Sequence, residues 1–324
     1  MRYPIVWGLL LLAVLAALRS SALCADGSLI LGPDHPDFLV QGEYSGEVTK
    51  PDGKKPLGVQ VLARDNGKFH AVGYYGGLPG AGWDKSEPRQ CDGQTTDGTT
   101  TFQDGAYTSK IHAGEMVITA DGGALVGKLQ KVSRRSPTLE AKPPAGAVVL
   151  FDGHGSDQFD PGQTSADGLL MPGATSKRKF RSGTLHLEFR LPFAPLEPSR
   201  GNSGCYLQSR YEVQILDSFG LAPHNHECGG IPSVKEPDLS MCYPPLAWQT
   251  YDVVFTAAQY ENGKKVKNAR MTLRHNGTVV HDDVEVPHAT TSSPLPEGSD
   301  AGPLNLQEHG GEVRFRNIWF LEKT

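Results

Sequence analysis

The clearest pattern in the chain is an alternation of apolar and polar residues in its second half. Leu185, Leu187 and Phe189 alternate with His186 and Glu188. Successive side chains of a β-strand point to opposite faces of a sheet, so this pattern predicts a half-buried strand. The histidine and the glutamate are expected on its polar face.

A second alternating segment follows a short distance along the chain. Tyr211, Val213 and Ile215 alternate with Glu212 and Gln214. The aromatic and β-branched residues are typical of a strand face that packs on a core. The segment therefore predicts a strand whose other face carries the glutamate and the amide.

The last part of the chain carries two turn and bulge signals. Asn276-Gly277 stands between apolar segments and supplies the positive φ angles of a type I′ hairpin turn. Segment 313–321 is apolar-rich, and Asn317 shifts its alternation as a β-bulge would. We expect a hairpin at 276–277 and a bulged final strand.

The first half of the chain also contains short apolar or alternating segments, each closed by Gly, Asp or Asn. They are 59–63, 69–75, 106–111, 116–119 and 124–131. This spacing predicts a small β-rich domain. Segment 76–104 is rich in Gly, Thr and Asp and is predicted to be a long loop.

Composition supports an all-β fold. The 324 residues include 38 Gly and 24 Pro, and no stretch after residue 26 keeps a helical period for three turns. Regularly spaced strands of this kind favour a β-sandwich, most simply a jelly roll. We predict a β-rich domain over 26–133, a Pro-rich linker over 134–147 and a jelly-roll domain over 148–324.

Residues 1–25 have the features of a secretory signal peptide. Arg2 precedes an apolar run over 5–18, and small residues follow at 20–25. An uncleaved anchor is the alternative, but the run is shorter than the roughly 20 apolar residues of a membrane span. We expect a secreted or periplasmic protein with no membrane span after signal removal.

The charge balance argues against a nucleic-acid partner. Lys and Arg total 31 against 36 Asp and Glu, a formal net charge of −5. Such a chain offers no basic field for phosphates.

Export changes what the cysteines predict, because oxidising compartments permit disulfides. Cys24 is expected to leave with the signal or to stand at the new terminus, and four others remain, which allows three pairings. Cys228 and Cys242 bracket a loop rich in Gly and Pro, and they are the predicted pair. The chain contains neither a CxxC nor an HExxH motif, so a structural zinc site is not expected.

The strand at 211–215 also carries the candidate chemistry. Glu212 and Gln214 share its polar face, and a bulge before Asp217 would bring a second carboxylate to that face. Two carboxyl groups in different environments can divide acid and base roles, and such a polar row can bind sugar hydroxyls. The alternative is that these acids are the solvated side of a sheet.

Several separated motifs resemble one known family. Arg-Gly-Asn-Ser-Gly at 200–204 and Tyr-Glu-Val-Gln-Ile-Leu-Asp-Ser at 211–218 look like the core motif of the 3-keto-disaccharide hydrolase domain family. Matching segments also lie at 151–153, 248–252, 275–277, 302–310 and 313–319. The resemblance covers about residues 148–323. It implies a concanavalin A-like (laminin G-like) jelly roll, exported in bacteria, that acts on sugars oxidised at ring C3.

The chain departs from the family pattern at three points. Glu308 stands where the resemblance leads us to expect Asp or Asn, and Cys205 stands where an aliphatic residue is usual. The opening motif at 151–153 lacks the tryptophan that often follows Asp-Gly.

The resemblance implies an elimination that needs a base, an acid for the leaving oxygen and stabilisation of an enolate. Glu212 or His309 is the candidate base, with the other assisting the leaving group. Arg200, or a divalent cation in its place, would stabilise the enolate. The expected sugar-binding residues are Arg200, Asn202, Gln214, Asp217 and Gln307.

A rival hypothesis is a carbohydrate-binding protein without catalysis, because the same fold and polar face would suit a lectin. Such a protein is expected to expose aromatic platforms. Near the motif there are only Tyr206, Tyr211 and Trp248, so the pattern favours the enzyme.

Overall fold

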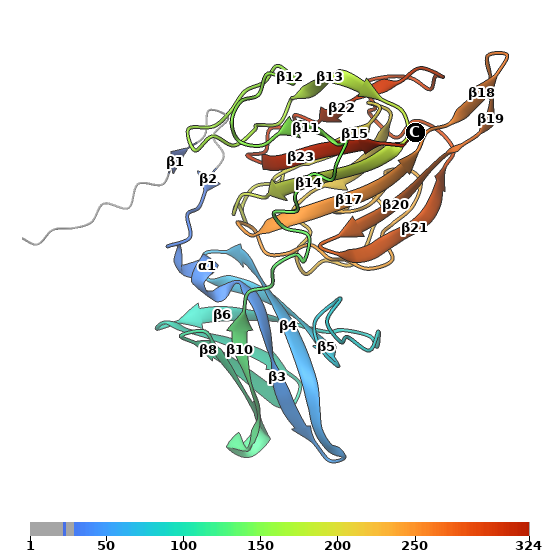
Figure 1. Cartoon of the computed structure of the whole chain (residues 1–324). Coiled ribbons are helices and arrows are strands. Elements are labelled where there is room, and N and C mark those ends of the chain that lie inside the picture. Colours follow the sequence, from blue (N-terminus) through green and yellow to red (C-terminus); the bar gives the residue numbers. More distant parts are fainter. Residues whose placement is uncertain (1–21, 24–28, 324) are drawn as a thin grey trace, which may run out of the picture.

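The computed structural model (Figure 1) describes residues 22–23 and 29–323. Apart from residues 22 and 23, the predicted signal segment lies outside the described residues, as does Cys24. β1 (Ala22–Leu23) pairs with β2 (Leu29–Ile30), and α1 (Pro36–Val40) follows. Among the described residues, no helix has the length and apolar character needed to cross a membrane.

Eight antiparallel strands in the first half of the chain form a closed barrel. Each strand pairs with the next, and the last pairs with the first. The strands are β3 (Gly42–Lys50), β4 (Gly53–Asp65), β5 (Lys68–Tyr75), β6 (Arg89–Thr96), β7 (Thr99–Asp104), β8 (Tyr107–His112), β9 (Glu115–Ala120) and β10 (Leu125–Val132). A 3₁₀ turn (Asp121–Gly123) joins the last two strands.

The barrel corrects one prediction. Segment 76–104, predicted to be a loop, is a loop only until residue 88, and β6 and β7 occupy the rest. The inward-facing residues of β6 include Arg89, Cys91 and Gly93. The strand therefore lacks the alternating apolar residues by which a strand is predicted from sequence. β-branched threonines and the pairing needed to close the barrel stabilise these strands instead.

The second half of the chain is a sandwich of two antiparallel sheets, as Figure 1 shows. The six-stranded sheet has the order β11 (Val148–Phe151), β23 (Arg314–Glu322), β14 (Gly183–Arg190), β17 (Trp248–Thr256), β20 (Ala269–His275) and β21 (Thr278–Val286). The five-stranded sheet has the order β12 (Phe159–Asp160), β13 (Thr175–Phe180), β22 (Gly302–Leu306), β15 (Ser203–Leu207) and β16 (Tyr211–Ile215). A separate hairpin joins β18 (Gln259–Glu261) to β19 (Lys264–Lys267). The predicted all-β fold is confirmed.

The turn and bulge predictions are also confirmed. Asn276 and Gly277 both adopt positive φ angles, 50° and 80°, between β20 and β21. Asn317 has a φ of 44°, and the register of β23 against β14 shifts at this point.

The barrel and the sandwich share apolar contacts. Leu62, Val72 and Tyr74, on the outer face of the barrel, belong to the core cluster of the sandwich. Phe193 of the sandwich packs into the barrel cluster, where its ring lies 5.2 Å from that of Phe38. The barrel lies against the sandwich at the end that carries α1 (Figure 1).

The polar face of β14 is buried, which corrects the expectation of a half-buried strand. Residues 136–141 of the linker cross this face. The backbone N–H of Glu140 donates to Glu188, and the Thr138 hydroxyl donates to Asp252 at 2.6 Å. Both His186 and Glu188 have no exposed side-chain surface. Alternation predicted which residues leave the core, but not that the linker covers them.

Candidate active site

The three strands β22, β15 and β16 present one face to the core and one face away from it. Cys205, Val213 and Leu306 belong to the core cluster. Because neighbouring residues of a strand alternate, the intervening side chains point to the outer face of the sheet. Tyr206 and Glu212 are direct cross-strand partners on that face.

Glu212 lies across the backbone of β15. A Cβ atom added at Gly204 would stand 2.1 Å from Glu212 Oε1, so only glycine at this position allows the carboxyl to lie there. The residue is only 3% exposed. Burial raises the pKa of Glu212 to about 7, and a hydrogen bond with Tyr206 opposes part of that rise.

Tyr206 connects Glu212 with Gln307. The side-chain amide of Gln307 donates to the Tyr206 hydroxyl at 3.1 Å, and that hydroxyl donates to the backbone carbonyl of Thr291 at 3.2 Å. Burial, followed by the neighbouring charge of Glu212, raises the pKa of Tyr206, so the phenol keeps its proton. The site therefore combines a carboxyl whose pKa lies near 7, a phenolic O–H and an amide donor.

The segment after β22 runs beside the segment before β15. The backbone N–H of Gln307 donates to Gly204 at 2.8 Å, and Gly311 lies against the backbone of Asn202. Asn202 Oδ1 is buried without a hydrogen-bond partner among the described residues. His309 is exposed on the same segment. Gln307 thus contacts Tyr206, the partner of Glu212, and Asn202 and His309 lie on the two adjoining loops.

Arg200 belongs to a second polar cluster. Its guanidinium donates two hydrogen bonds to Glu227, at 3.0 and 3.1 Å, and one to the backbone carbonyl of Asp217. The Ser218 hydroxyl donates to the same glutamate at 2.6 Å. The guanidinium is therefore already held by a bidentate ion pair.

The structure separates Asp217 from Glu212. β16 ends at Ile215, and the Asp217 carboxylate accepts from the backbone N–H of Phe219 at 3.3 Å. Burial raises the pKa of Asp217 to about 7, and its charge in turn acts on the core thiol of Cys242. Asp217 thus lies in the segment after β16, beside Phe219, and not on the strand that carries Glu212. Gln214 keeps the predicted face, but its Oε1 accepts from the backbone N–H of Ile215.

The predicted disulfide between Cys228 and Cys242 is absent, because all four described cysteines are free thiols. Both residues are buried, and Cys228 Sγ lies 3.1 Å from the Tyr251 hydroxyl. Burial, reinforced by a hydrogen bond with Cys228, raises the pKa of the Cys242 thiol. The two thiols are neighbours in the core and share a hydrogen bond.

The sequence motifs indicate no chemical role for two members of the site, Gly204 and Tyr206. The signal for both was the alternation through β15, which places them opposite Glu212 once the pairing of β15 with β16 is known. Over the described residues, no group of three or more His, Cys, Asp or Glu side chains is arranged to hold a metal ion.

Comparisons with known proteins agree with the motifs. A family model described as the 3-keto-alpha-glucoside-1,2-lyase-like domain matches residues 146–321. The chain resembles the crystal structure of a putative glycosyl hydrolase from Parabacteroides distasonis ATCC 8503, with 30% identity, a TM-score of 0.50 and coverage of 56% of this chain and 85% of that one. A second structure of that description and organism has 17% identity, a TM-score of 0.42 and coverage of 55% and 95%. No curated protein matches the chain.

Proposed function

Because the chain belongs to the 3-keto-alpha-glucoside-1,2-lyase-like family, we propose that it cleaves the glycosidic bond of 3-keto-disaccharides or related 3-keto-glycosides. The observation that carries this proposal is the Glu212 carboxyl, buried beside Tyr206 with a pKa raised to about 7. A general base is most effective when its pKa lies near the working pH. The family and the glycosyl hydrolase-like fold support a sugar-active hydrolase, and the buried carboxyl supports this particular chemistry.

The ketone at C3 determines the reaction. It makes the proton on C2 acidic, because the electron pair left on C2 delocalises onto the C3 oxygen as an enolate. When the enolate collapses, the bond between C1 and its glycosidic oxygen breaks, and the leaving oxygen takes a proton. Water then adds across the C1–C2 double bond, with hydroxyl at C1 and a proton at C2, to give the free 3-keto-sugar.

The residues of the site divide these tasks. Glu212 removes the C2 proton and returns one to C2 during hydration. The Tyr206 O–H donates to the Thr291 carbonyl at 3.2 Å and accepts from Gln307 at 3.1 Å; with substrate bound it would turn from that carbonyl to the enolate or the leaving oxygen. We place Tyr206 in the role first expected of Arg200, because Tyr206 is the cross-strand partner of Glu212, whereas the Arg200 guanidinium is held by a bidentate ion pair with Glu227. His309 remains the second candidate for proton transfer.

Other residues would bind the sugar. The unpartnered Oδ1 of Asn202 is suited to accept from a sugar hydroxyl, since a buried acceptor without a partner is costly. Gln307 has one amide oxygen for a further hydroxyl. Gln214 and Asp217 would act by holding the end of β16 through their hydrogen bonds to backbone N–H groups. A divalent cation at the enolate oxygen would assist the same step.

The decisive experiment compares 3-keto-trehalose with plain trehalose as substrates. We expect release of 3-keto-glucose from the first and no cleavage of the second, because only the ketone acidifies the C2 proton. Chromatography of the products measures both reactions. Comparable cleavage of trehalose would point to ordinary glycosidase chemistry instead, whereas binding of 3-keto-trehalose without turnover would favour the carbohydrate-binding alternative.

We further propose that the protein is exported to the periplasm or secreted. The apolar run over 5–18 and the small residues at 20–25 support this. Expression of the full chain in a bacterial host, followed by fractionation and N-terminal sequencing, is expected to give a mature chain that begins close to residue 26. Recovery of the chain from the cytoplasm with residues 1–25 intact would refute it.

A further inference from the structure

The barrel contains a cavity that the proposed hydrolysis does not use. Its volume is about 400 Å³, and its lining comes from strands β3 to β10, none of which carries the Glu212 site. An eight-stranded barrel is just wide enough for its side chains to fill it or for it to hold one small ligand. A volume in this range is typical of small-molecule sites.

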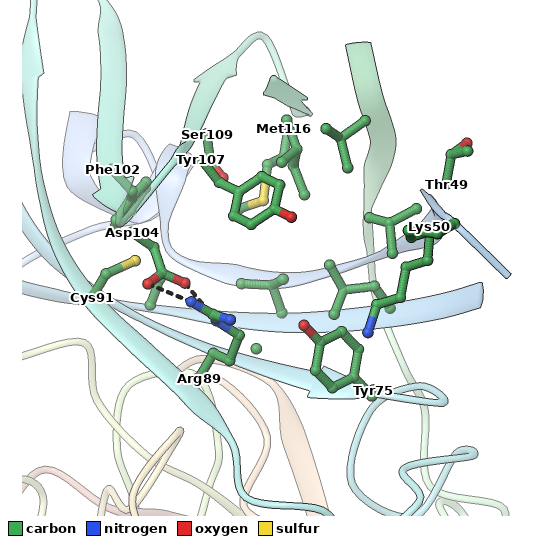
Figure 2. Close-up of a pocket in the computed structure, with 18 residues that line it drawn as sticks. Thr49, Lys50, Tyr75, Arg89, Cys91, Phe102, Asp104, Tyr107, Ser109 and Met116 are labelled. Carbon is green, nitrogen blue, oxygen red and sulfur yellow. Dashed lines mark hydrogen bonds and ion pairs between the residues drawn. The ribbon is translucent and has the colours of Figure 1, made fainter. Parts of the chain in front are cut away.

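One end of the barrel is filled and the other is hollow. Toward α1, inward-facing side chains such as Tyr44, Val61 and Phe69 are fully buried. The cavity lies at the opposite end, where its lining includes Lys50 at the end of β3 and Asp104 and Tyr107 beside the β7–β8 turn; Figure 2 shows these side chains together with Phe102 and Met116. The wall is mainly apolar and includes Val48, Leu57, Val59, Ala71, Ile118 and Val126.

Polar and charged groups gather at the mouth. Figure 2 shows Arg89 paired with Asp104, with Nε–Oδ2 and Nη2–Oδ1 distances of 2.6 and 2.8 Å, which balances both charges. Lys50 Nζ stands 3.5 Å from the centre of the Tyr75 ring. The three charged residues of the lining sum to one positive charge, that of Lys50, which also interacts with the carboxylates of Asp52 and Asp84 outside the lining.

An apolar interior with a lysine ammonium at its mouth is complementary to an amphipathic anion. We propose that the barrel binds a small lipophilic anion, with an aliphatic or aromatic body in the cavity and a carboxylate or similar group beside Lys50. The apolar body would be removed from water along the wall, which is the main source of affinity. The charged group fixes its direction in the barrel.

Gly73 offers a direct test, because it faces the cavity between Ala71 and Tyr75 on β5. Its φ is not in the left-handed region, and an added Cβ would meet nothing closer than 3.8 Å. Gly73→Phe should therefore fill the cavity without strain at the backbone. Lys110→Phe adds the same ring at an exposed position of β8 and is the matched control.

The experiment measures displacement of the fluorescent probe 1-anilinonaphthalene-8-sulfonate by dodecanoate and by dodecanol, each below its aggregation concentration. We expect one dodecanoate to bind per chain. Gly73→Phe should weaken this binding by about tenfold or more, because the added ring and the ligand would overpack the same space. Lys110→Phe should leave the binding unchanged. Lys50→Met should weaken dodecanoate binding by about 2- to 5-fold and leave dodecanol unaffected.

Three results would overturn the proposal: no binding of either compound, binding that Gly73→Phe leaves unchanged, or equal affinity for dodecanol and dodecanoate. Circular dichroism of each variant establishes that the barrel is folded. Turnover of 3-keto-trehalose should be the same in all three variants. The barrel proposal and the hydrolase proposal therefore succeed or fail separately.

Discussion

Replacing Glu212 with glutamine is expected to lower turnover of 3-keto-trehalose by about 10²-fold or more, the contribution of a positioned general base. Glutamine keeps the shape of the side chain that lies across Gly204, but it cannot accept the C2 proton. Folding should be retained, because burial already favours the uncharged form of Glu212. Steady-state kinetics and a thermal melt of the same preparation measure both expectations.

The pH profile gives this test a second, independent readout. The carboxyl must be deprotonated to act as a base, and its pKa is raised to about 7. The value of kcat/KM in the native protein should therefore rise with pH through about 7 and then level off. In Glu212→Gln this rise should disappear from whatever activity is left.

Glu261→Gln is the matched control, because it makes the same chemical change at an exposed position of the β18–β19 hairpin. It should leave both turnover and the profile unchanged. If Glu212→Gln instead turns over the substrate at the native rate, Glu212 is not the base, and His309→Asn becomes the first variant to test.

The sequence predicted the face of Glu212 but not its environment. Alternation through Tyr211, Val213 and Ile215 requires the residues between them to leave the core, because only one face of the strand is apolar. The raised pKa comes from burial, which depends on groups outside this pattern: the carboxyl lies across the backbone at Gly204, and the hydroxyl of the loop residue Thr290 accepts from the Glu212 backbone N–H at 2.9 Å. A local pattern carries no information on such contacts.

The missed strands of the barrel have a related explanation. β6 and β7 turn residues such as Arg89, Cys91 and Asp104 toward the cavity. A strand that packs on a filled core has an apolar residue at every second position, whereas a strand that lines the mouth of a cavity can carry polar residues there. The polar residues that face the cavity therefore explain why these strands were not predicted, and they also make the barrel a candidate binding site.

The cluster beneath the linker leads to the second large effect. Glu188 accepts from Arg316 Nε at 2.7 Å and from Asn317 Nδ2 at 2.9 Å, and the Glu140 N–H also donates to it. Burial alone would raise the pKa of Glu188, but hydrogen bonds from His186 and these groups lower it to about 2. Removing one member of a buried ionic network is strongly destabilising, because it leaves its partners without compensation.

Glu188→Gln is therefore expected to lower the free energy of unfolding by about 3 kcal/mol near pH 5.5. This figure follows from a carboxyl whose pKa moves from 4.5 to about 2 on folding, at about 1.4 kcal/mol for each pH unit. Urea denaturation followed by tryptophan fluorescence measures it. Glu261→Gln again serves as the exposed control and should change the unfolding free energy by less than about 0.5 kcal/mol.

The pH dependence of this difference identifies its source. The pKa of Glu188 is lowered on folding, so its contribution is complete above about pH 4.5 and is lost as the pH falls toward about 2. Burial would lower the pKa of His186, but hydrogen bonds to Asp252 and Glu188 raise it. The contribution of His186 to the free energy of unfolding is therefore complete below its unfolded pKa of about 6.5. It is lost as the pH rises through the higher pKa of the folded state.

The free-energy difference between the native protein and Glu188→Gln should thus be largest between about pH 4.5 and 6.5 and should decline on both sides. Using the difference cancels the contributions of other buried groups, such as His275, whose pKa burial lowers to about 3. A difference that stays constant from pH 2 to pH 9 would mean that the glutamate acts through its shape alone. A decline on both sides would show that the charges of Glu188 and His186 fix the linker to the outer face of the six-stranded sheet.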